Sequence, residues 1–293
     1  MADQISLRTP APAAAREPRR RRARGFAPAA PVLAFLLLCF ALPVLALLLR
    51  SIMEPRLGLQ NYAALLATGT YANVLENTFL ISFIVTAITA VVGLPLAWFI
   101  TVAPRRLGRL VFGIVILSMW TNLLARTYAW MVLLQDTGPI NNFLIWTGII
   151  KNPLPLYGSM AGVVIGMVYI MLPFMVISLR GPLAALDPAM FQAASLCGAS
   201  RLQSFTRIFL PLLLPGLGAG GLIIFVMSLG YYITPSLLGG AQDMMLAELI
   251  AQQVQTLLNW GLAGAASFVL LVVTLALYAV QARYLAPHGR KGH

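Results

Sequence analysis

Residues 187–217 read DPAMFQAASLCGASRLQSFTRIFLPLLLPGL and lie between two long apolar runs. Asp187 and Pro188 predict the start of a helix, because an Asp side chain caps free backbone amides and proline fits the first turn. Gly198 predicts the left-handed residue at which this helix ends. The segment therefore carries its own start and stop signals.

A second helix is predicted directly after that glycine. Ser200 and Gln203 have the spacing of a capping box, which marks a helix start. Pro211 and Pro215 should end or kink the chain that follows. A short loop between two apolar runs has no folding reason to be so ordered, so we interpret it as a docking surface.

The composition indicates an all-α integral membrane protein. Apolar residues make up 60% of the 293 residues and charged residues only 10%, which is more apolar and far less charged than a soluble domain. A membrane-spanning helix needs about 20 apolar residues. Six such runs are predicted, at about 29–50, 78–103, 110–134, 158–180, 212–234 and 263–284. The predicted parts are a disordered basic cytoplasmic tail (1–27), a transmembrane domain (28–285) and a cytoplasmic C-terminal tail (286–293).

Basic residues are distributed unevenly between the two sides of the predicted membrane. With the N-terminus inside, the outer side holds only Arg50, Arg56 and Lys151, whereas the arginine-rich tail and most other basic residues lie inside. Loops rich in Lys and Arg stay on the cytoplasmic side. We therefore expect both termini and residues 181–211 to be cytoplasmic in a bacterial inner membrane, and the net charge of +12 to reflect topology.

The spacing within the ordered loop resembles a known family. The matching residues are Gln192, Ala193, Ala194, Gly198, Ala199, Ile208, Leu210 and Pro211. This pattern resembles the EAA loop of ABC importer permeases. The resemblance implies that the loop is the coupling helix, which sits in a groove of the ATPase subunit. Gln192 departs from the family's usual Glu: it keeps the length and hydrogen bonding but loses the charge that a salt bridge to the ATPase would need.

The same loop also has a rival interpretation. Ala194, Gly198 and Ser200 have the spacing of a DNA-binding helix-turn-helix, in which residues 201–209 would be the recognition helix. No soluble domain surrounds the element, however, and hydrophobic segments tether it at both ends. We therefore expect no nucleic-acid partner.

The chain lacks the motifs of nucleotide or metal chemistry. Its two lysines, Lys151 and Lys291, do not lie in a phosphate-binding loop, so ATP and Mg²⁺ are expected on a partner ATPase and no cofactor on this chain. Gly216, Gly218 and Gly221 match a dinucleotide fingerprint formally, but they lie inside a predicted span and indicate helix packing instead. Neither a disulfide nor a metal site is expected from Cys39 and Cys197.

Further pieces resemble the spermidine/putrescine branch of these permeases, over roughly residues 60–280. They are Arg126–Trp130, Gly138–Asn142, Tyr169–Phe174, Leu237–Gly240 and Gln252–Gln253. The resemblance implies an assembly with a second permease, two ATPase subunits and a periplasmic solute-binding protein. The predicted spans are poor in acids that would attract a polyamine, so the solute stays open between a polyamine and another small compound, such as an amino-acid-like one.

One set of residues is a candidate for the solute path: Trp120, Arg126, Tyr128, Trp130, Tyr169, Tyr231 and Tyr232. Aromatic rings can hold organic cations, but they also form belts at the membrane surface, and both roles stay open. Arg126 lies inside a span, where an arginine costs about 2.5–3.5 kcal/mol. A salt bridge, with Glu76 as one partner, a carbonyl contact and a pathway role are its three alternatives.

The sequence as a whole predicts the permease subunit of an ATP-driven ABC importer, not an enzyme, working by alternating access. An ion-coupled secondary transporter is the competing class. Such a transporter would need acids or broken helices around a coupling ion, and the chain has few such acids. A membrane enzyme is less favoured still, because no nucleophile, base or metal cluster stands out.

Overall fold

The computed structural model describes residues 30–284, and every regular element in that range is a helix. The chain divides into two units, Met1–Ala46 and Leu47–His293. The described part of the first unit is one apolar helical stretch. It comprises α2 (Ala30–Leu36), the π-turn η2 (Leu37–Ala41) and the start of α3 (Leu42–Met53), and none of the π-turn residues is buried. Such a stretch suits a lipid environment.

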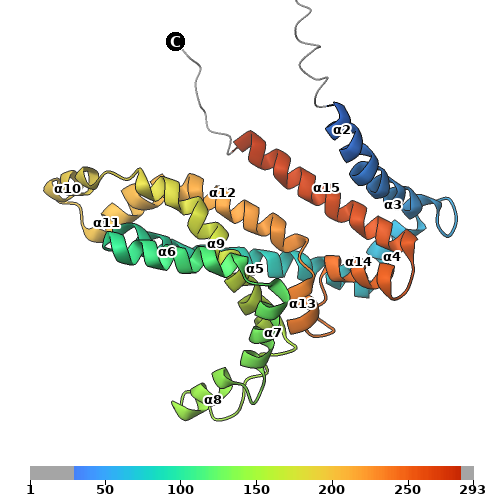
Figure 1. The fold of residues 1–293 in the computed structure, drawn as a ribbon, viewed down its shortest axis with the longest axis horizontal. Helices are drawn as coiled ribbons and strands as arrows, with labels where there is room; N and C mark the ends of the chain where they lie inside the picture. Colours follow the sequence, from blue (N-terminus) through green and yellow to red (C-terminus); the bar gives the residue numbers. More distant parts are fainter. Residues whose placement is uncertain (1–29, 285–293) are drawn as a thin grey trace, which may run out of the picture. The chain divides into compact units, whose positions relative to one another are not determined.

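The second unit contains the remaining helices. Their bounds are α4 (Gln60–Ala67), α5 (Gly69–Val102), α6 (Arg105–Trp120), α7 (Leu123–Leu134), α8 (Pro139–Trp146), α9 (Met160–Ala184), α10 (Pro188–Leu196), α11 (Arg201–Ser204), η3 (Phe205–Phe209, a π-turn), α12 (Leu210–Leu229), α13 (Ile233–Leu238), α14 (Leu246–Gln255) and α15 (Trp260–Tyr284). Within this unit α5, α9 and α12 lie side by side, with α10 and α11 near one end and α4 and α14 near the other (Figure 1). We call these the α10 end and the α14 end.

Five helices in the described range are long and apolar enough to cross a membrane, and a bent pair makes up to six. The five are Pro31–Met53, Gly69–Val102, Met160–Ala184, Arg201–Leu229 and Trp260–Val280. The bent pair replaces the predicted span 110–134: Arg105–Trp120 and Leu123–Trp146 meet at 103°. The predicted apolar run is therefore present, but it is broken into two helices.

The cause of the break is a cap that the hydropathy pattern does not show. Thr121 is extended, and the side chain of Asn122 accepts hydrogen bonds from the amides of Leu124 and Ala125 at 2.9 and 3.2 Å. An Asn in this position starts a new helix. The 16 residues of α6 reach about 24 Å at 1.5 Å per residue, which is short of the roughly 30 Å hydrocarbon core.

Pro211 and Pro215 are expected to end or kink the chain after the loop, and they do not end the helix. The chain is helical from Arg201 to Leu229, with Pro211 in the first turn of α12 and Pro215 inside it. The π-turn η3 ends at Phe209, just before Pro211. Proline in a helix interior removes a backbone hydrogen bond and favours a kink, and a π-turn is one of the irregularities at which helices bend.

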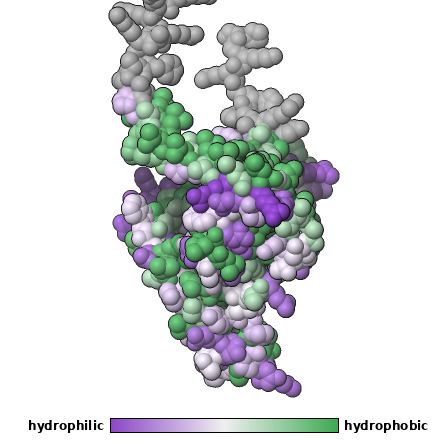
Figure 2. Space-filling view, turned by 90° about the vertical axis from the view of Figure 1, so that its right-hand side faces the viewer, coloured by the Kyte–Doolittle hydropathy of each residue, from purple (hydrophilic) through white to green (hydrophobic). Residues whose placement is uncertain are grey.

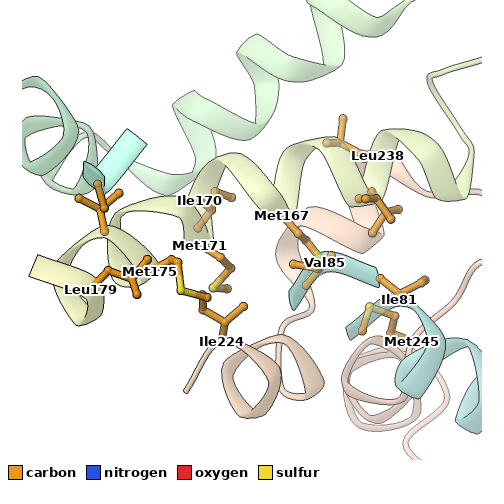
Figure 3. Close-up of a cluster of buried hydrophobic side chains, with 14 of the residues drawn as sticks. Ile81, Val85, Met167, Ile170, Met171, Met175, Leu179, Ile224, Leu238 and Met245 are labelled. Atoms are coloured by element: carbon orange, nitrogen blue, oxygen red, sulfur yellow. The ribbon is translucent and has the colours of Figure 1, made fainter. Parts of the chain in front are cut away.

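Methionine, isoleucine and leucine side chains of α5, α9 and α12 form the main core. Figure 3 shows Ile81 and Val85 of α5, Met167, Met171 and Met175 of α9, and Ile224 of α12 gathered between the helices. Glycines permit this close approach, as predicted. A Cβ at Gly220 would lie 2.8 Å from the Cβ of Ser178, and one at Gly166 would lie 2.6 Å from Leu238 Cδ1. At these two glycines a side chain of the neighbouring helix lies directly against the backbone, between α12 and α9 and between α9 and α13.

A second buried cluster holds the α14 end together. Leu246 and Leu249 of α14 pack with Leu262 and Ala266 of α15 and with Val74 of α5. Helix α8 has only 8 residues. That length cannot cross a bilayer.

Candidate functional site

The ordered loop at the α10 end has the local structure that its sequence predicts. The amide of Ala189 donates to Asp187 Oδ1 at 2.8 Å, and Pro188 occupies the first turn of α10. Gly198 follows the helix with φ +80°, a conformation that only glycine adopts freely. The stop signal is thus confirmed at the residue where it was expected.

The capping box at the start of α11 is also confirmed. The amide of Gln203 donates to Ser200 Oγ at 3.2 Å, and the amide of Ser200 donates to Gln203 Oε1 at 2.9 Å. Two backbone amides that would otherwise lack partners are satisfied by two side chains. The turn between α10 and α11 is therefore fixed locally and does not depend on a partner.

An aromatic cluster anchors the loop to the bundle. Phe209 is buried, and its ring centroid lies 5.3 Å from that of Phe205, 5.6 Å from that of Trp98 and 6.4 Å from that of Phe191. These residues come from η3, α5 and α10. Aromatic pairs at such distances contribute about 0.5–1.5 kcal/mol each beyond their buried area. The cluster joins the loop to α5 and to the start of α12.

The opposite side of the loop is an unpartnered apolar surface. Leu196 is 88% exposed and Leu202 is 72% exposed, and Met190 is also exposed. We call Met190, Leu196 and Leu202 the exposed loop face. Leucines this exposed in an ordered loop are typical of a protein interaction site.

The residues of the predicted coupling motif separate into two groups. Gln192, Ala193 and Gly198 are exposed, whereas Ile208 and Leu210 are partly buried. Of the remaining members, Ala194 and Ala199 are partly buried and Pro211 is exposed. The first group shares a surface with the exposed loop face, and the second group supports the base of the loop.

Two apolar cavities flank the aromatic cluster. One, of about 470 Å³, lies against Val102 and Leu186, and the other, of about 330 Å³, lies against Ala199. Trp98, Phe191 and Phe209 line both. Sequence reasoning missed these three aromatics. A usable signal existed, because Phe191, Phe205 and Phe209 all fall within the predicted docking element.

Arg126 makes a backbone contact and no ion pair. Its Nη1 donates to the carbonyl of Ser118 at 2.9 Å, while its Nε is buried and has no hydrogen-bond partner in the described part of the chain. The proposed partner Glu76 is not paired with it: among residues 31–280 the ion pair present is Arg50–Glu54, at 3.7 Å. Glu76 lies instead at the α14 end, where it lines a different cavity. Of the alternatives for Arg126, the carbonyl contact is the one the structure shows.

The aromatic candidates for a solute path do not form one site. Trp130 and Tyr169 meet edge to face with centroids 5.6 Å apart, and both they and Tyr231 pack against the main core. Trp120, Tyr128 and Tyr232 are exposed. The first group packs within the bundle and the second is exposed on this subunit, and a role of either group in a solute path stays a prediction.

The carboxylates of the second unit lie mostly away from the loop. Glu248 on α14 is half-buried, and burial raises the pKa of its carboxyl, an effect that a hydrogen bond from the Met245 backbone partly offsets. Within the five straight spans no Asp, Glu or Lys is present except Glu76 near the start of α5, and within the bent pair Asp136 lies between α7 and α8. A coupling-ion site of carboxylates inside the bundle is therefore not present in the described residues.

A bundle of several helices that can each cross a membrane, with an ordered loop at one end, is the architecture of a membrane permease. Residues 90–288 match the family described as "Binding-protein-dependent transport system inner membrane component". The chain belongs to this family, and it is a permease subunit of an ABC importer in the inner membrane. The resemblance noted in the sequence is confirmed.

The relatives and a solved structure agree with this assignment. The chain is 36% identical to the "Spermidine/putrescine transport system permease protein PotB" of Escherichia coli (strain K12), over 73% of this chain and 78% of the relative. The protein of the same description from Salmonella typhimurium (strain SL1344) is also 36% identical, over 73% and 75%. A chain of a bacterial alginate ABC transporter, solved with an alginate-bound periplasmic protein, superposes with a TM-score of 0.73 at 19% identity, covering 92% of this chain and 98% of that chain. This likeness supports the fold.

Proposed function

We propose that this chain assembles with a second permease, two ATPase subunits and a periplasmic solute-binding protein, and that ATP and Mg²⁺ bind to the ATPases. The observation that carries the proposal is the exposed loop face on an element that is rigid without a partner. A preformed apolar surface binds without losing chain entropy. The sequence also has no phosphate-binding loop of its own.

The docking contact consists of Gln192, Ala193 and Gly198 together with Leu196 and Leu202. The Gln192 side chain is exposed and makes no hydrogen bond among the described residues, so it is free to bond to the ATPase. Gln192→Glu should be tolerated, because the change keeps the shape and adds a charge only at an exposed position. Leu196→Asp should abolish co-purification of the ATPase with the permease, because it places a charge in an apolar contact.

ATP-driven closure of the ATPases would move the loop, and the bundle would follow as a rigid body. Trp98 carries the motion to α5, and Phe209 carries it to α12, because both rings belong to the aromatic cluster. Trp98→Ala should therefore leave the exposed loop face in place but weaken coupling. Normal ATPase binding with reduced solute-stimulated ATP hydrolysis is the expected result.

The solute that the relatives favour is a polyamine, because the PotB proteins carry that description. Arg126 gives a specific reason to keep a second candidate, a small amino-acid-like compound: its buried Nε lacks an acceptor, and a solute carboxylate would supply one. Uptake of labelled putrescine and spermidine, with competition by amino acids, separates the two. Saturable polyamine uptake that amino acids leave unchanged supports the first candidate, and the reverse pattern supports the second.

The orientation with both termini cytoplasmic has a direct test in the native cysteines. Cys197 is exposed in the loop, and Cys39→Ser leaves it as the one thiol in the chain. A membrane-impermeant maleimide should label Cys197 in inverted vesicles and not in intact cells. Efficient labelling in intact cells would place the loop outside and refute the orientation.

A further inference from the structure

A polar recess of about 770 Å³ lies at the α14 end, between the first turns of α5 and helix α14. Its polar lining consists of Thr70, Tyr71, Asn73, Glu76, Asn77, Gln242, Gln252 and Gln253. Figure 2 looks onto this end of the unit and shows hydrophilic side chains gathered there among apolar ones. No lysine or arginine lines the recess. Its one formal charge is the carboxylate of Glu76.

The walls of the recess are held by contacts between distant parts of the chain. Asn77 Nδ2 donates to the carbonyl of Gln242 at 2.6 Å, and the amide of Leu246 donates to Thr78 Oγ1 at 2.8 Å. Thr78 is itself buried and donates to the carbonyl of Val74 at 2.6 Å. These bonds fix the segment before α14 against α5. The recess is therefore part of the fold and not a gap between loops.

One wall carries the amide of a largely buried side chain. Gln253 is only 3% exposed, and its side-chain nitrogen and oxygen are not among the fully buried polar atoms that lack a partner. Gln253 lines the recess, so its amide is available to a ligand there both as a donor and as an acceptor.

We propose that this recess binds the free solute through a primary ammonium group. An ammonium has three donors and needs acceptors: the carboxylate of Glu76 supplies a charged one, and the amide oxygens of Gln253 and Asn73 supply neutral ones. The volume lies in the range of small-molecule sites, about 300–1,000 Å³. The assignment rests on the proposed function in one respect, that the solute is an amine, and it places an amine site at the end opposite the coupling loop.

The test measures binding of putrescine and spermidine to the purified full-length chain in detergent, by calorimetry, without a binding protein. 1,4-Butanediol serves as the uncharged probe of the same length. Glu76→Gln removes the charge and keeps the shape, and it should weaken diamine binding about tenfold or more, because it removes a hydrogen bond to a charged group. Gln253→Leu should weaken binding several-fold. Glu248→Gln, which removes a carboxylate on the same helix as Gln253 but outside the recess lining, should leave binding unchanged.

Three results would overturn the assignment. They are no saturable diamine binding to the wild type, equal binding of the diamine and the diol, and equal loss of binding in Glu76→Gln and Glu248→Gln. A fourth is weaker co-purification of the binding protein in Glu76→Gln with diamine affinity unchanged, because the recess would then take a side chain of that protein. Measuring polyamine uptake separates a wrong assignment of the recess from a wrong proposed function. Wild-type polyamine import with an unaffected Glu76→Gln variant refutes the recess alone, whereas diamine binding without import refutes polyamine transport alone.

Discussion

Replacing Gly198 by Asp should uncouple the permease while leaving it folded. Gly198 has φ +80°, and a Cβ built on it meets no atom within 4 Å. The cost of the substitution is thus backbone strain without a clash, about 1–2 kcal/mol for an L-residue in this conformation. A charge then stands beside Leu196 on the exposed loop face. The permease should still insert and pack, but bind the ATPase weakly.

Gly148 provides a matched control. It has φ +75°, again with nothing within 4 Å of an added Cβ, and it lies just after α8, outside the coupling loop. Gly148→Asp should therefore carry the same strain of about 1–2 kcal/mol and the same new charge. Any difference between the two variants comes from the surface that Gly198 shares with a partner.

The assay is co-purification of the ATPase with the permease, followed by solute-stimulated ATP hydrolysis, with thermal unfolding in detergent to show that both variants are folded. Gly148→Asp should behave like the wild type in binding and hydrolysis, and Gly198→Asp should lose most of both. Equal retention of the ATPase by the two variants would refute the coupling-helix assignment. Equal loss would show that backbone strain alone is responsible, and would refute the argument from the shared surface.

Three other substitutions follow from the packing and the charges. Gly220→Leu should lower the free energy of unfolding by about 1–3 kcal/mol through overpacking, since its Cβ would lie 2.8 Å from Ser178. Gly113→Leu is the control, because an added Cβ there meets nothing within 4 Å. Similar melting curves for the two variants would contradict the α9–α12 contact. Burial raises the pKa of the Glu248 carboxyl, so the folded chain holds its proton more tightly than the unfolded chain. Stability should then fall as the pH rises from below about 4.3, and Glu248→Gln should reduce that slope; an unchanged slope would contradict it. Arg126→Ala should lower folded yield or uptake, because it removes the hydrogen bond from the guanidinium to the Ser118 carbonyl at the break between α6 and α7. A hydrogen bond from a charged group contributes about 1.5–3 kcal/mol. Wild-type yield and uptake in this variant would show that the bond is dispensable.

The parts of the fold that the sequence predicts are those whose signals are local. Asp187, Gly198 and the Ser200 capping box each act on backbone groups within three or four residues, and all three are found as expected. The glycines of α12 likewise pack against a neighbouring helix, as their position in an apolar run suggests. In each case one residue type has one dominant physical effect.

The features that were missed depend on context that no short window contains. Asn122 caps a helix in the middle of an apolar run, where hydropathy averages over the break. Thr78 reads as an ordinary polar residue at the edge of a span, but its hydroxyl bonds to Leu246, 168 positions away. That bond and the one from Asn77 to Gln242 join the two segments that line the polar recess, so the recess could not be predicted from either segment alone.

The contacts within the bundle determine how a moving loop can act on it. The helix from Arg201 to Leu229 runs from the loop into the core, and its Gly220 lies so close to α9 that even a methyl group would collide with Ser178. Interiors packed to this density transmit a displacement and do not absorb it. A force on α10 that reaches Phe209 must therefore move α9 and α12 together, because one cannot slide past the other without separating. The π-turn η3 lies between the loop and this rigid pair, and π-turns are frequent at functional positions of helices. Phe209, the last residue of η3, is buried in the main core, so we expect a displacement of the loop to reach α9 and α12 through this turn.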